Sequence, residues 1–168
     1  MLALKVFDRG TTVVLTFEHS LLSLSKWEAR TKKPYLTRGP KSTDEMIDYY
    51  RDMLTSPEHD PDLVYRLSPE DLDRLDKYIN DPQTAGSFPP ESEGSKHGEV
   101  VTSDTLYMQM TVLHIDFRAE AWHLNRLMML IAKVAHAKTP QKKEDKRAAL
   151  SRWSDINAKN RAFFKSKG

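Results

Sequence analysis

The sequence predicts a mainly α-helical protein, a helical bundle of about six helices with an N-terminal β-hairpin. Two runs rich in β-branched and aromatic residues come first. Most later segments begin with a Ser, Thr or Asp and continue with apolar residues at helical spacing. The 168 residues include no cysteine, which excludes disulfides, Cys-ligated metals and thiol catalysis. A chain of this length can bury a sizeable core without them.

Residues 1–168 are expected to form a single domain with three parts. These are a β-hairpin over 2–17, a helical body over 20–137 with a flexible loop over 80–98, and a basic amphipathic C-terminal helix over 140–165. The loop is rich in Pro, Gly and Ser, a composition typical of linkers.

The first two elements are strands over Leu2–Phe7 and Thr12–Phe17. Gly10, in the four residues between them, can take the positive φ that a tight turn requires. An isolated two-stranded hairpin is only marginally stable in water. This hairpin must therefore pack on helices or be completed by strands from another subunit.

Three helices of the body have clear start signals. Ser20 can cap the first, Ser42 and Glu45 form a capping box before the second, and Ser68 followed by Pro69 starts the third. The first of these helices is expected to end before the proline at position 34. The apolar faces of the three helices are Leu21, Leu24 and Trp27, then Met46, Ile47, Tyr50 and Leu54, then Leu72, Leu75, Tyr78 and Ile79.

The second half of the chain predicts a short helix near Asp104–Leu113 and a break at Ile115. Asp116 is then expected to cap one long helix over Phe117–Ala137, the central helix of the core. A narrower amphipathic helix follows Pro140. The apolar residues on the long helix are Phe117, Ala121, Leu124, Leu127, Met128, Leu130, Ile131, Val134 and Ala135.

The formal net charge of +2 conceals a strong asymmetry. From Lys133 onward there are eleven Lys or Arg residues against three Asp or Glu, whereas the preceding residues carry 15 basic and 21 acidic side chains. An acidic body with a basic tail is typical either of binding an acidic partner, nucleic acid included, or of attraction between the two parts of the molecule.

Catalytic motifs are absent from the sequence. There is no glycine-rich phosphate loop and no G-x-S-x-G elbow before a helix. The best candidate is Glu120 with His123, because Glu-x-x-His binds metal in ferritin-like bundles. Those sites need a second such motif and this chain has only one, so we expect a capped helix start with a polar face. We expect no enzymatic activity, no catalytic residue, no cofactor and no metal, with His19 and His136 as structural or surface residues.

Methionines and aromatic residues are the candidates for binding surfaces. Met108, Met110, Met128 and Met129 either fill core gaps or form an adaptable surface, and core filling is the favoured interpretation. Trp122 lies off the main apolar line of its helix, which leaves it for an exposed contact or for packing against the hairpin.

Aromatic residues also alternate with Lys and Arg in the basic tail. They predict either a protein-binding amphipathic helix, which is favoured, or a nucleic-acid surface over residues 138–168 in which rings stack on unpaired bases.

Membrane insertion and secretion are not expected. The longest apolar run, Leu127–Ala132, is far shorter than the ~20 residues that span a bilayer. The first ten residues include Lys5, Asp8 and Arg9 where a signal peptide needs an apolar stretch. The sequence therefore predicts a soluble cytoplasmic protein.

Two stretches resemble a known family. They are Thr-Phe-Glu-His-Ser-Leu-Leu-Ser-Leu-Ser-Lys-Trp-Glu at residues 16–28 with Lys-Pro-Tyr-Leu at 33–36, and Trp-His-Leu-Asn-Arg-Leu at 122–127 with Ile131, Asn157, Asn160 and Arg161. These residues resemble small proteins encoded among phage tail genes, where the tail assembly chaperones of long non-contractile tails are found.

The resemblance implies a non-enzymatic, mostly α-helical chaperone that coats the tape-measure protein while the tail tube polymerises and is then released. It implies the host cytoplasm as location, absence from the mature virion, a tape-measure or other tail protein as partner, and self-association into a homo-oligomer. A structural virion protein of the tail or head–tail junction and a small nucleic-acid-binding regulator are the alternatives. The candidate partner-binding residues are Trp27, Trp122, Arg126, Trp153, Ile156, Arg161, Phe163 and Phe164.

Overall fold

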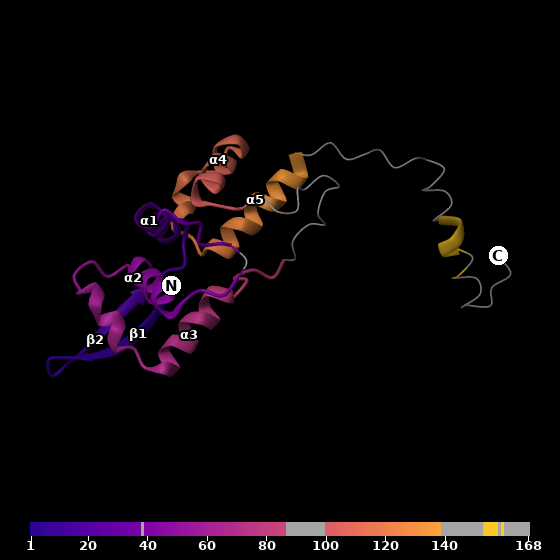
Figure 1. Cartoon of the computed structure of the whole chain (residues 1–168). Coiled ribbons are helices and arrows are strands. Elements are labelled where there is room, and N and C mark those ends of the chain that lie inside the picture. The colour runs from indigo at the N-terminus through magenta and orange to yellow at the C-terminus, as the bar shows by residue number, and fades with distance from the viewer. Residues whose placement is uncertain (38, 87–99, 139–152, 158, 160–168) are drawn as a thin grey trace. The chain divides into compact units, whose positions relative to one another are not determined.

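The structure is a computed structural model that describes residues 1–37, 39–86, 100–138, 153–157 and 159. The chain divides into two units, Met1–Ala137 and Lys138–Gly168, and each is described by itself. The first is mainly helical with an N-terminal two-stranded antiparallel sheet (Figure 1), which confirms the predicted fold class. The single domain over 1–168 stays a prediction, and most of the loop predicted over 80–98 lies outside the described residues.

The hairpin forms as the sequence predicts. Strand β1 (Leu2–Asp8) pairs antiparallel with β2 (Thr11–Phe17). The two turn residues, Arg9 and Gly10, have φ of 46° and 84°. Two positive φ angles in a two-residue loop define a type I′ turn, whose twist matches that of the flanking strands.

Helices of the same unit stabilise the hairpin. Its inward residues pack into a core with residues of the first three α-helices, and β2 is extended by the segment after α2. There the Thr55 N–H donates to the Thr16 carbonyl at 2.9 Å, and the Glu18 N–H donates to the Met53 carbonyl at 2.9 Å. The first of the two alternatives from the sequence, packing on helices, is therefore confirmed.

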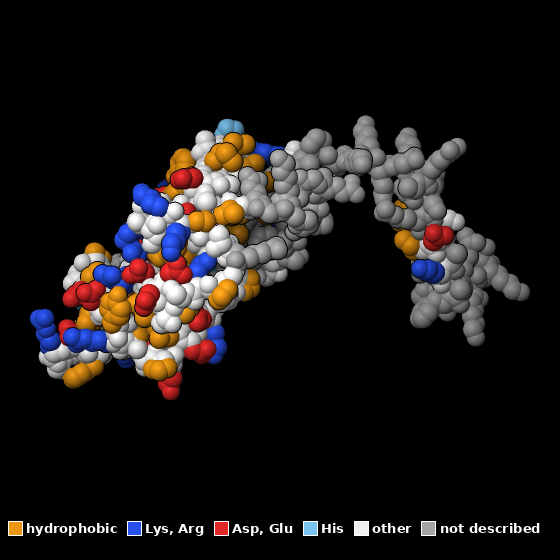
Figure 2. All heavy atoms as spheres, viewed as in Figure 1, with side chains coloured by type: hydrophobic (Ala, Val, Ile, Leu, Met, Phe, Trp, Pro, Cys, Tyr) orange, Lys and Arg blue, Asp and Glu red, His pale blue; other side chains and the backbone are white. Residues whose placement is uncertain are grey.

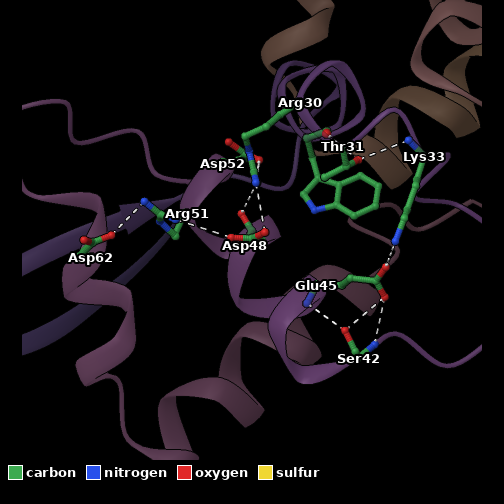
Figure 3. Close-up of polar contacts among 10 residues, drawn as sticks. Arg30, Thr31, Lys33, Ser42, Glu45, Asp48, Arg51, Asp52 and Asp62 are labelled. Atoms are coloured by element: carbon green, nitrogen blue, oxygen red, sulfur yellow. Dashed lines mark hydrogen bonds and ion pairs between the residues drawn. The ribbon is translucent and has the colours of Figure 1, made fainter.

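The predicted caps define the helices of the first half. These helices are α1 (Leu21–Thr31), α2 (Thr43–Asp52) and α3 (Pro69–Asn80). The 3₁₀ helix η1 (Pro61–Arg66), which Asp60 caps, was not predicted. Ser20, Ser42 and Ser68 each accept a hydrogen bond from the backbone N–H three residues on. The capping box of Ser42 and Glu45 is complete (Figure 3).

The prediction of one long helix over Phe117–Ala137 is wrong. After α4 (Ser103–Leu113) the chain forms a 3₁₀ helix η2 (Phe117–Ala121), then α5 (Leu124–Lys138). Asp116 caps η2, not α5. Trp122 is extended, with φ −73° and ψ 161°, and the Leu124 N–H donates to the His19 carbonyl at 2.6 Å instead of continuing a helix. Phe117 is consequently 51% exposed and lies outside the core.

Two hydrophobic clusters make up the core, and α1 contributes to both. The first cluster contains Leu4, Val6, Leu15, Phe17, Trp27, Tyr49, Tyr50, Met53, Leu63, Val64, Leu67 and Leu75. The second contains Leu21, Leu24, Leu106, Met110, Ala119, Leu124, Leu127 and Ile131. No described helix has both the length and the apolar character that crossing a bilayer requires.

Ion pairs connect the exposed sides of the helices around the first cluster. The Arg30 guanidinium of α1 contacts Asp48 at 3.1 Å and Asp52 at 2.8 Å, both on α2 (Figure 3). Arg51 reaches Asp62 of η1 at 2.9 Å. Such partly exposed pairs each contribute at most about 1 kcal/mol, so they orient the helices more than they hold them together.

Glu28 connects α1 to α4 across the second cluster. Its carboxylate accepts hydrogen bonds from the Tyr35 N–H at 3.0 Å and from the Ser103 N–H and hydroxyl at 2.7 and 2.6 Å. Ser103 is the first residue of α4, where a carboxylate also complements the positive end of the helix dipole. One side chain therefore fixes the start of α4.

We predict that Glu28→Ala lowers the free energy of unfolding by about 1–3 kcal/mol, because partly buried N–H donors lose their acceptor. Urea denaturation of the whole chain measures this change. Glu28→Gln keeps one acceptor oxygen and should fall in between. Lys26→Ala, an exposed site on the same helix, is the control and should change stability by less than about 0.5 kcal/mol. Equal losses at positions 26 and 28 would contradict the assignment.

Candidate functional site

An apolar groove between α4 and α5 is the candidate site, with a cavity volume of about 390 Å³. On α4, Met108 and Val112 remain 57% and 65% exposed. The side chains that line the groove are Val101, Leu106, Met108, Gln109, Val112, Leu113, Met128, Ile131, Ala132 and Ala135.

Helical spacing explains why the groove forms. Met108 and Val112 are four residues apart and lie on one face of α4. Met128, Ala132 and Ala135 follow the same rule on α5. Because alanine side chains are short, they leave open space opposite the long methionine and the branched valine.

The groove is electrically neutral. Gln109 is the one polar residue among the described side chains that line it, and none of them is titratable. A surface of this kind binds apolar side chains, and it offers no group that can donate or accept a proton in a reaction.

The methionines fall into both of the predicted roles. Met110 and Met129 are buried, with 0% and 5% of their surface exposed, and fill the core as expected. Met108 is exposed and Met128 is half-buried, and both line the groove. Composition alone could not distinguish the buried methionines from those that line the groove, because the difference depends on how α4 and α5 are oriented in the folded chain.

Trp122 and Arg126 form a second surface feature. The Arg126 guanidinium lies 4.6 Å from the centre of the Trp122 ring, a cation–π contact, and Trp122 is 40% exposed. Ile115 and Leu130 line a shallow hollow of about 330 Å³ beside the ring. Of the two roles predicted for Trp122, the structure places it in the exposed one.

Trp27 is not available to a partner, and its prediction as a binding residue is wrong. Its side chain is 1% exposed and packs edge-on against Tyr35 at a centroid distance of 5.0 Å. The helical spacing that places Trp27 in line with Leu24 already indicated a core position.

The C-terminal candidates are described only in part. Trp153 and Ile156 lie on one helical stretch and are 66% and 51% exposed. Arg161, Phe163 and Phe164 lie outside the described residues, so their predicted roles stay predictions.

Glu120 and His123 do not meet. The Glu120 carboxylate accepts a hydrogen bond from the Tyr107 hydroxyl at 2.8 Å, whereas the His123 Nε2–H donates to the Tyr78 carbonyl at 3.0 Å. The extended residue Trp122 interrupts the helix between Glu120 and His123, so the two side chains point to different partners. Among the described residues no three or more His, Cys, Asp or Glu side chains are grouped closely enough to hold a metal ion. His136 is exposed at the surface.

A buried polar centre surrounds His19 instead. The His19 Nδ1 hydrogen-bonds the Tyr49 hydroxyl at 2.7 Å, and the His123 ring packs edge-on against His19 at 5.2 Å. Burial and the neighbouring His123 lower the pKa of His19 to about 3, and burial also lowers the pKa of His123. Both rings are therefore neutral at pH 7 and serve the fold, as predicted for His19.

A scan against protein-family models, a search of curated proteins and a search of solved structures find no match to this chain.

We predict that stability falls as the pH drops below about 6.5. Below about pH 6.5 His19 is protonated in the unfolded chain, but in the folded chain it stays neutral until about pH 3. The free energy of unfolding therefore decreases by up to about 1.4 kcal/mol for each pH unit in this range. His19→Asn places an amide near the Nδ1 position and removes the titration. Its urea-derived stability should depend less on pH between about 6.5 and 5, whereas the exposed control His136→Asn should behave as wild type. Equal slopes in all three proteins would contradict the prediction.

Proposed function

We propose that this protein is a phage tail assembly chaperone, which binds and solubilises the tape-measure protein while the tail tube assembles. The observation that carries the proposal is the neutral apolar groove between α4 and α5, with Met108 and Val112 exposed along it. The resemblance of residues 16–28 and 122–127 to proteins encoded among phage tail genes supports it. The protein acts by binding, without making or breaking bonds, in the host cytoplasm, and is absent from the mature virion.

The groove suits the chemistry of such a client. A tape-measure protein is long, helical and partly apolar, so before assembly it exposes stripes that would aggregate unless covered. An amphipathic helix presents apolar side chains three and four residues apart, which is the pattern that a groove between two helices accepts. Met108 and Met128 are flexible enough to adapt to stripes of different sequence.

The expected affinity of one groove is low, which fits a partner that must later be released. Covering Met108 and Val112, which are already partly buried, contributes less than the about 1.5–3 kcal/mol that full burial of such a side chain provides. Association itself costs about 4–15 kcal/mol. A single groove therefore binds weakly, and several copies bound along one client, in contact with one another, together provide the strength.

We predict that Met108→Glu combined with Val112→Glu abolishes client solubilisation, because the groove would bury charges against an apolar stripe. The chain is co-expressed with the tape-measure protein encoded beside it, and the client is quantified in the supernatant after centrifugation. Phe117→Glu, at a similarly exposed apolar residue outside the groove, is the control and should act as wild type. A client that stays equally insoluble with and without the wild-type chain, or equally soluble with the double variant, would contradict the proposal.

Mass spectrometry of mature particles distinguishes this function from that of a structural virion component. A chaperone should be absent or substoichiometric, whereas a structural protein should be present in fixed multiples.

A further inference from the structure

The outer edge of β2 is covered by the chain itself. The Thr16 N–H donates to the Ser56 hydroxyl at 3.0 Å, and the Thr16 carbonyl accepts from the Thr55 N–H at 2.9 Å. Both backbone groups of Thr16 therefore point away from β1. In an antiparallel ladder the residue opposite such a position also points both of its groups outward, and Ala3 lies opposite Thr16.

The edge of β1 is open. Because the outward orientation recurs at every second residue, Lys5 and Phe7 share it with Ala3. Among the described residues outside the hairpin, none has a backbone hydrogen bond to Ala3, Lys5 or Phe7. The edge therefore offers a row of N–H and C=O groups to another strand.

The side chains along this edge are apolar at both ends. Met1 is 74% and Phe7 68% exposed, the two highest values among the large apolar side chains of the described residues. Between them Ala3 and Lys5 are exposed on the same face of the strand. Pairing with another strand that covers Met1 and Phe7 is favourable, provided that Lys5 does not lie opposite a second positive charge.

We propose that β1 pairs with β1 of a second copy, antiparallel across a two-fold axis, to form a four-stranded sheet. Alignment about Lys5 would place two lysines opposite each other, which is unfavourable. With the axis at Leu4 instead, Lys5 faces Ala3 of the second copy and Phe7 faces Met1, so charge is separated and the exposed apolar ends cover each other. With the axis at Val6, Ala3 would lie opposite Arg9 in the turn of the second copy, and Met1 would have no strand residue opposite it.

A second copy fits this edge better than an unrelated strand does. Two-fold pairing uses the same edge on both subunits, so it closes and leaves no β1 edge for further addition. The open edge of β1 carries this inference, which does not depend on the proposed function or on the α4–α5 groove.

Sedimentation equilibrium of the full chain tests the proposal. The wild type should be a monomer–dimer system, and Phe7→Lys should raise the dissociation constant at least about tenfold, because it replaces an apolar contact on both sides of the axis. Thr12→Lys changes an exposed residue opposite Phe7 on β2 and should leave dimerisation unchanged. A chain that is monomeric at all concentrations, or a dimer that both variants affect equally, would overturn the proposal.

The register has its own test, because the chain contains no cysteine. Under mild oxidation, Ala3→Cys combined with Lys5→Cys should form a covalent dimer much faster than Lys5→Cys alone. Faster or equal cross-linking by the single variant would overturn the alignment about Leu4. Hydrogen exchange at the amides of residues 3, 5 and 7 should slow as the dimer forms, and exchange at the monomer rate in a dimeric sample would overturn the pairing itself.

Discussion

The arrangement of this protein depends on one junction, where the segment between β2 and α1 meets the segment between η2 and α5. The Leu124 N–H donates to the His19 carbonyl, and the rings of His19 and His123 pack on each other in the interior. The His123 Nε2–H reaches the Tyr78 carbonyl, which brings α3 to the same point. This junction fixes where α5 begins, and therefore which of its residues face the core and which face the groove.

Local signals predicted the first half of the fold, and non-local contacts decided the rest. The caps at Ser20, Ser42 and Ser68 act within one helical turn, so the sequence is sufficient to place those helix starts. The apolar period over Phe117–Ala137 favours one helix throughout. At the break the Leu124 N–H bonds the carbonyl of His19, about one hundred positions earlier, and the periodicity of a local segment carries no information on such a distant contact.

The candidate groove could be predicted only in its parts. For Met108 and Met128 the sequence favours core filling over an adaptable surface, and it places Met128 and Ala135 on the apolar face of a helix. Their meeting depends on α4 and α5 both packing into the second core cluster, a tertiary arrangement to which Glu28 and the junction at His19 contribute. The prediction of Trp27 as a binding residue is wrong for a different reason. It considered only the aromatic character of the side chain, although the helical spacing from Leu24 already placed Trp27 on the core face of its helix.

The helix α5 divides its surface among three tasks, and that division bears on the function. Leu124, Leu127 and Ile131 face the second core cluster, while Met128, Ala132 and Ala135 face the groove. Arg126 and Leu130 lie four residues apart on the remaining side of α5, next to Trp122, which precedes the helix. A tryptophan that is 40% exposed under an arginine gains only about 0.5–1 kcal/mol from that contact, so the fold does not explain its position. Trp and Arg are the side chains that contribute most at protein interfaces, so this exposed contact fits the partner-binding role predicted for Trp122 and Arg126, which stays a prediction.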